Sequence, residues 1–130
     1  MVKSNTIANN LIISKNSIVS ILIFNILRDL GLIPTLKGSK LLNKAIQIVL
    51  NSDSDFIVLE DIYTKIASSY TGFNAVQVKN AIKYAIDTRN SSKAIANFEN
   101  IFGYPYDKYF FTNKIMIEEI ARVVRSKLEL

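Results

Sequence analysis

Residues 62–87 constrain the fold of this chain more than any other part of the sequence. Apolar residues recur every three or four positions on both sides of Gly72, which is the spacing of two amphipathic helices joined by a turn. Asn74, just after that glycine, is a residue type that caps the N-terminus of a helix well. The segment therefore predicts a helix-turn-helix, in which two helices cross at a short turn.

Three residues have the properties that such a unit needs where its two helices touch. Ala67 is small enough for the second helix to cross close by, Gly72 tolerates the backbone of the turn, and Val78 fills the core. Gly72 and Val78 each lie one position further from Ala67 than is usual in this unit. One extra residue in the turn accounts for both shifts.

Helical periodicity covers most of the rest of the chain, and no useful length alternates with the two-residue period of a strand. The sequence therefore predicts an all-α fold, a single domain of about six helices with no β wing. The expected helices cover residues 17–30, 39–50, 58–70, 75–88, 92–103 and 112 or 113 to 128. The first is apolar nearly all round and is expected to lie deep in the core. Residues 1–16 are expected to form a flexible lead-in, which leaves residues 17–130 as the helical domain.

The residue types that are missing exclude most chemistry. The 130 residues include no cysteine and no histidine, so the chain lacks a thiol nucleophile, the commonest general base and the usual zinc ligands. Its four glycines form no phosphate-binding pattern, and its 11 carboxylates are scattered without a paired nucleophile. The sequence predicts no enzymatic activity, no catalytic residue, no metal site and no cofactor.

The net charge and the second helix of the predicted helix-turn-helix, residues 75–88, both favour a nucleic-acid partner. A net charge of +5 favours an anionic partner. Glutamine and asparagine can pair with adenine in the DNA major groove, and lysine can reach guanine or phosphate. The predicted contacts to double-stranded DNA, mostly from the outer face of helix 75–88, are Asn74, Gln77, Lys79, Asn80, Lys83 and Tyr84. Further phosphate contacts are expected from Lys37 and Lys65, with Lys40 and Arg89, if these fold onto the same side. Two alternatives stay open, a solvated helix face and a protein-binding face.

Residues 18–27 are the most apolar run in the chain, but Ser20 and Asn25 interrupt the run. A membrane span needs about 20 apolar residues, so a buried helix is the better interpretation. No membrane association is expected, and the expected compartment is the cytoplasm.

Four segments in order along the chain carry a family resemblance: LKGSKLLNKAI (residues 36–46), VKNAIKYAID (78–87), IFGY (101–104) and TNKIMIEEIA (112–121). On these segments the chain resembles the C-terminal DNA-binding effector domain of the master response regulator of sporulation in Gram-positive bacteria. The likeness runs from about residue 17 to residue 124. The resemblance implies a six-helix domain that binds short DNA boxes, as a homodimer or as tandem protomers, and contacts RNA polymerase.

The chain departs from the family pattern at the positions that read DNA. Lys79 and Asn80 stand where the family typically has Glu-Arg, and Lys83 and Tyr84 stand where it has Arg-His. The helices match the family pattern, but the residues expected to contact DNA bases differ, so an altered DNA sequence preference is expected. The family's N-terminal receiver domain is also expected to be absent, as in a stand-alone effector domain, because residues 1–16 are too few to form one.

Two functions follow from these observations. The first is a sequence-specific DNA-binding transcription regulator that uses residues 75–88 as its recognition helix. The second is a protein-interaction module that pairs with a full-length sporulation regulator and modulates it without reading DNA. The loop after Pro105 supports the second if its aromatic side chains are exposed, although these side chains are also suited to covering the core; they are Tyr104, Tyr106, Tyr109, Phe110 and Phe111.

Overall fold

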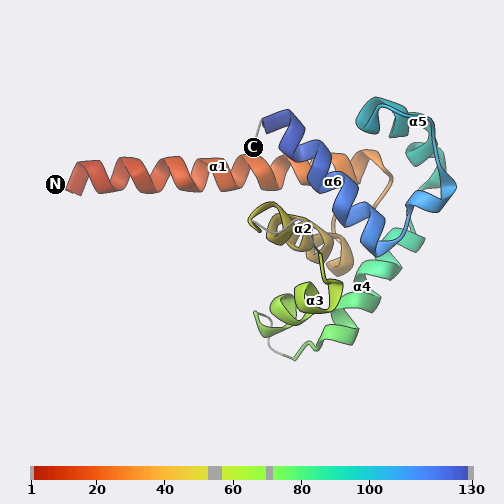
Figure 1. Ribbon diagram of the computed structural model, residues 1–130, viewed down its shortest axis with the longest axis horizontal. Helices are drawn as coiled ribbons and strands as arrows, with labels where there is room; N and C mark the ends of the chain where they lie inside the picture. Colours follow the sequence, from red (N-terminus) through yellow and green to blue (C-terminus); the bar gives the residue numbers. More distant parts are fainter. Residues whose placement is uncertain (1, 53–56, 70–71, 129–130) are drawn as a thin grey trace.

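The computed structural model describes residues 2–52, 57–69 and 72–128, with side chains described from residue 16 onward. This part of the chain forms six α-helices and one short 3-10 helix and contains no strand, which confirms the predicted all-α fold (Figure 1). The elements are α1 (Val2–Asp29), α2 (Lys37–Leu50), α3 (Leu59–Ser68), α4 (Ala75–Asp87), α5 (Ser91–Phe102), η1 (Lys108–Phe110) and α6 (Asn113–Leu128).

Except at the N-terminus, the helix boundaries agree with the predicted ones to within two residues. The predicted starts of α4 and α6 are confirmed, and α2 begins at Lys37 instead of Ser39. The first helix was expected from Ser17, but α1 begins at Val2. Residues 2–16 contain neither glycine nor proline, so nothing in them breaks a helix. Position 16 is therefore not a helix boundary, and the predicted flexibility of the lead-in stays a prediction. The third helix was expected to end at Tyr70, which lies outside the described residues, but α3 ends two residues earlier, at Ser68.

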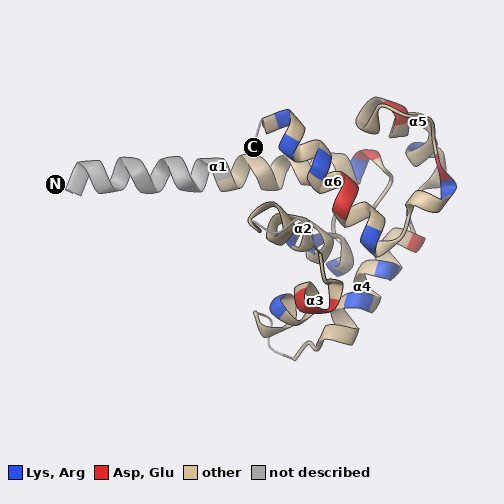
Figure 2. Ribbon diagram, viewed as in Figure 1, with Lys and Arg blue, Asp and Glu red and all other residues tan. Residues whose placement is uncertain are grey.

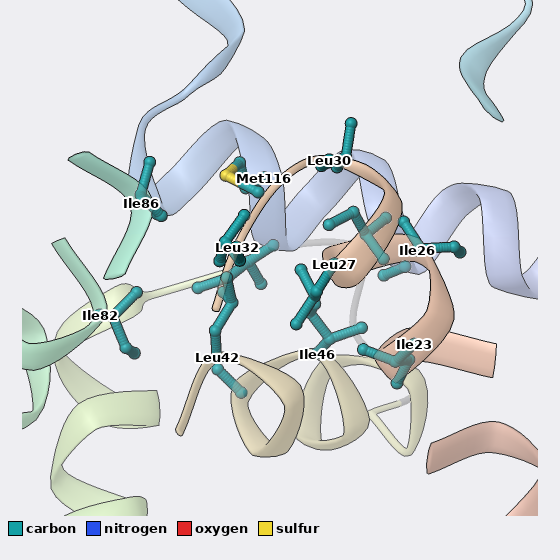
Figure 3. Close-up of a cluster of buried hydrophobic side chains, with 14 of the residues drawn as sticks. Ile23, Ile26, Leu27, Leu30, Leu32, Leu42, Ile46, Ile82, Ile86 and Met116 are labelled. Carbon is teal, nitrogen blue, oxygen red and sulfur yellow. The ribbon is translucent and has the colours of Figure 1, made fainter. Parts of the chain in front are cut away.

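The core forms where α1, α2, α4 and α6 meet. Figure 3 shows side chains from these helices converging on one cluster, among them Leu27, Ile46, Ile82 and Met116. All four are buried, each on the side of its helix that faces the cluster. The cluster fixes α4 against the body of the domain.

The prediction that the first helix lies deep in the core is wrong for one of its faces. Ile23, Ile26 and Leu27 are buried. Ile18, Ile21 and Phe24 are exposed on the other side of α1, with Ile21 58% accessible. The helix packs on the domain along one stripe only, and its all-round apolar composition did not show which stripe that is.

Close packing between α2 and α4 depends on Gly38. A Cβ added at Gly38 would lie 1.9 Å from the carbonyl oxygen of Ala81 and 2.8 Å from the Cβ of Ala85. Real atoms do not approach so closely, so only glycine lets the first turn of α2 rest on α4. This contact holds the middle of α4 against the domain.

The turn between α3 and α4 has the features that the sequence predicts for a helix-turn-helix. Gly72 adopts a φ of 87°, a left-handed conformation that favours glycine. Val78 is fully buried, and Ala67 is half-buried in the last turn of α3. The predicted roles of Gly72 and Val78 are confirmed, and α3 packs against α4. The role of Ala67 at the crossing stays a prediction.

The aromatic loop covers the core. Phe98 of α5 is fully buried, and its ring packs against the rings of Tyr104, Tyr106, Phe110 and Phe111 at centroid distances of 5.4, 5.5, 4.9 and 6.2 Å. Tyr109 is the exception in this loop, at 72% exposure. The loop therefore does not present the exposed aromatic surface that favoured a protein partner.

In the part of the chain that the structure describes, no helix is long and apolar enough to cross a membrane.

Candidate nucleic-acid interface

α4 presents one apolar face to the domain and one polar face to solvent. Val78, Ile82, Ala85 and Ile86 are buried against the other helices. In Figure 1, α2 and α3 lie beside α4 at the edge of the molecule. The exposed side chains of α4 are Val76, Gln77, Lys79, Asn80, Lys83, Tyr84 and Asp87. The structure thus gathers five of the predicted DNA contacts on one surface, which we call the α4 face.

The N-terminus of α4 is held by a reciprocal pair of hydrogen bonds. The backbone N–H of Gln77 donates to Asn74 Oδ1 at 2.8 Å, and the backbone N–H of Asn74 donates to Gln77 Oε1 at 2.9 Å. This capping box satisfies two of the N–H groups that a helix start leaves without partners. Both side-chain oxygens are occupied, so Gln77 can pair with adenine through two hydrogen bonds only if the box opens. The role of Asn74 in this arrangement is to order the first turn of α4.

An ion pair lies at the C-terminal half of the α4 face. Lys83 Nζ contacts Asp87 Oδ2 at 2.6 Å across one helical turn. More than half of each side chain is exposed, so the pair adds little to stability. The ion pair has a larger effect on the binding of an anionic ligand, because the Asp87 carboxylate neutralises the Lys83 ammonium that would meet a phosphate. Tyr84, beside Lys83, has 61% of its surface exposed.

Lys37 joins this surface from α2. Its Nζ lies 4.3 Å from the ring centroid of Phe73, which directly precedes Asn74. This is the geometry of a cation–π contact. The contact places the ammonium of Lys37 at the N-terminal end of α4, where the partial positive charge of the helix terminus already favours an anion.

The other predicted basic contacts lie elsewhere. Lys65 lines a groove between α2 and α3, next to Lys44 and Gln47. Lys40 lines a groove between α1 and α2. The guanidinium of Arg89 stacks on Phe111 at 3.7 Å and donates to the carbonyl oxygen of Ile86 at 2.9 Å. None of these described contacts brings Lys65, Lys40 or Arg89 to the α4 face, so their role as phosphate contacts stays a prediction.

The basic residues are distributed over several helices. Figure 2 shows Lys and Arg residues on α3, α4 and α6, with acidic residues also on α3 and α6. On the α4 face the cations are Lys79 and Lys83, and Asp87 is the carboxylate. Among the described residues, no three acidic side chains gather in a way that could hold a metal ion.

Sequence reasoning missed Val76. This valine is 63% exposed on the first turn of α4. The predicted contacts all carry hydrogen-bonding side chains, so an exposed apolar residue was not among them. Its spacing of four residues from Asn80 was the signal that would have placed it on the same face.

Comparison with known proteins identifies the family. No curated protein and no solved structure matches the chain. The model of the family described as sporulation initiation factor Spo0A C terminal matches residues 23–124, which is most of the chain. This match confirms the resemblance carried by the four sequence segments. The chain belongs to the Spo0A C-terminal family, the effector domain that binds DNA in Spo0A and that is not known to be catalytic.

Proposed function

We propose that this protein is a sequence-specific DNA-binding transcription regulator and that α4 is its recognition helix. The observation that carries the proposal is the α4 face, where Lys79, Asn80 and Lys83 stand together on a helix whose opposite side is buried. A helix held in this way can enter the major groove with its polar side forward.

The residues of the α4 face divide into two roles. Asn80, unlike Gln77, takes no part in the capping box, so it is the amide best placed for pairing with adenine N6 and N7. Lys79 and Lys83 flank Asn80 and carry the charge that meets phosphates or guanine. Lys37 extends the cationic surface past the N-terminus of α4 through its position over Phe73.

Binding selection on random duplex DNA with the purified chain tests this function. We expect enrichment of one defined motif, followed by a mobility shift on that motif whose affinity falls as salt rises. Each phosphate neutralised contributes about 0.9 to the slope of log affinity against log salt. Replacing both Lys79 and Lys83 by alanine should lower the affinity and reduce that slope by up to about 1.8.

The matched control replaces two exposed lysines away from the α4 face, Lys93 of α5 and Lys127 of α6, by alanine. It removes the same net charge, so a loss confined to the Lys79 and Lys83 variant identifies the α4 face. Equal losses in both variants would mean that binding responds to net charge alone. A chain that enriches no motif and instead co-purifies with a full-length sporulation regulator would be an interaction module.

A further inference from the structure

Val76 is the apolar residue of the α4 face. It exposes 63% of its surface on the first turn of α4, whereas Val78, two residues later, is fully buried. Valine is also a weaker helix former than alanine, so neither packing nor helix propensity explains its presence at this position.

The position of Val76 is central on that face. At 3.6 residues per turn, the spacings of four, three and four residues place Val76, Asn80, Lys83 and Asp87 along one line of the helix. Buried Val78, Ile82 and Ala85 lie on the opposite side. Val76 therefore points away from the domain in the same direction as Asn80 and Lys83.

The backbone at Val76 is fixed before any ligand arrives. The two residues of the capping box, Asn74 and Gln77, lie on either side of it in the sequence and are joined by two hydrogen bonds. The branched side chain has few rotamers, so little freedom remains to be lost on binding. Val76 thus offers a preorganised apolar contact at the N-terminal end of α4, the end of a recognition helix that meets base edges.

The DNA major groove contains one apolar group on its base edges, the C5 methyl of thymine. We propose that Val76 contacts the C5 methyl of a thymine and so specifies a T·A pair at one position of the DNA site. This inference rests on the proposed function and names part of what the α4 face recognises. Asn80 lies one turn further, about 6 Å along the axis. The adenine that Asn80 reads then lies within about two base pairs of the thymine.

Deoxyuridine scanning of the selected motif tests the inference. Each thymine is replaced in turn by deoxyuridine, which removes only the C5 methyl, and affinity is measured for the wild type, Val76→Ala and Ile95→Ala. We expect one thymine at which the replacement weakens wild-type binding by about fourfold, the effect of one buried methyl group. Val76→Ala should bind the thymine motif more weakly and show no further loss with deoxyuridine at that position.

Ile95→Ala is the matched control, because Ile95 is a branched residue that is 56% exposed on α5. α5 follows the C-terminal end of α4, whereas Val76 lies in the first turn of α4. Figure 1 shows α5 at the opposite end of α4 from α3. This variant should keep the full deoxyuridine effect. Both substitutions are at exposed helix positions, where alanine has a higher helix propensity than valine or isoleucine. Circular dichroism checks that each variant is helical.

The outcomes separate the inference from the function on which it rests. The role of Val76 is overturned if a motif is selected but no thymine-to-deoxyuridine replacement weakens binding. It is also overturned if Val76→Ala keeps the full loss on that replacement. Either result leaves the proposal that α4 reads DNA intact. Failure to select any motif overturns both.

Discussion

Asn113 Nδ2 donates a hydrogen bond of 3.0 Å to the hydroxyl of Tyr63, 50 residues earlier in the chain. The same amide donates to the carbonyl oxygen of Lys79 at 3.1 Å. Tyr63 is a buried residue of α3, and Lys79 lies in α4. One side chain at the start of α6 therefore joins both helices of the helix-turn-helix and sets their relative position.

Replacing Asn113 by alanine should lower the free energy of unfolding by about 1–2 kcal/mol, because two hydrogen bonds are lost and the Tyr63 hydroxyl stays buried. Urea denaturation followed by circular dichroism measures the change. Ser126→Ala, at an exposed position of the same helix, should change stability by less than about 0.5 kcal/mol. Equal stability of the two variants would show that the Asn113 contacts do not hold α6 to α3 and α4.

Stability should fall as pH rises above about 10, the ordinary pKa of tyrosine. Burial raises the pKa of Tyr63 above that value, and the charge of Glu60 adds to the rise, although the hydrogen bond from Asn113 opposes both. The unfolded chain therefore loses its phenol proton first, so the stabilisation is complete below the unfolded pKa and is lost as pH rises through the folded pKa.

Tyr63→Phe should remove part of this alkaline loss while costing about 1 kcal/mol at neutral pH. Urea midpoints measured from pH 8 to 11 check both effects. Burial also raises the pKa of Tyr104, so some alkaline loss remains in this variant. Tyr109→Phe is the control, because that exposed ring should leave the whole profile unchanged. A Tyr63→Phe profile as steep as that of the wild type would rule out the buried phenol as a source.

Gly38→Ala should destabilise the domain by more than about 2 kcal/mol, because the new Cβ would meet the carbonyl oxygen of Ala81 and push α2 from α4. Gly72→Ala isolates the second cost of replacing a glycine, the backbone strain of a side-chain-bearing residue at positive φ. Gly72 has a φ of 87°, but no atom lies within 4 Å of an added Cβ. Backbone strain alone should then cost about 1 kcal/mol. Thermal or urea unfolding compares the two variants, and a smaller effect at Gly38 than at Gly72 would contradict the close packing of α2 on α4.

Asp87→Asn should strengthen binding to the selected DNA motif if α4 is the recognition helix. The change removes the carboxylate that contacts Lys83 at 2.6 Å and releases that lysine for a phosphate. The expected gain is several-fold at low salt, with a salt slope steeper by up to about 0.9, depending on how much of the Lys83 charge Asp87 neutralises in the wild type. Glu99→Gln, at an exposed position of α5, changes the net charge equally and should have a smaller effect. Mobility shifts over a salt series distinguish the two, and equal gains would assign the effect to net charge.

Local signals in the sequence were enough to predict the helices, the turn and most of the α4 face. Apolar spacing selects the buried stripe of α4, and the period of the helix then places Lys79, Asn80 and Lys83 opposite that stripe. Gly72 and Asn74 mark the turn and the cap because their preferences depend on their own backbone and a few neighbouring residues.

The positions of the supplementary cations depended on packing between segments that are distant in the sequence. Nothing near Lys37 in the sequence indicates that it lies over Phe73, and nothing near Lys65 indicates that it lines a groove beside α2. The exposed stripe of α1 could not be predicted either, because an all-round apolar helix does not specify which side is covered. Periodicity thus assigns a residue to a face of its own helix, whereas the neighbour that this face meets follows from the contacts among all the helices in the folded domain.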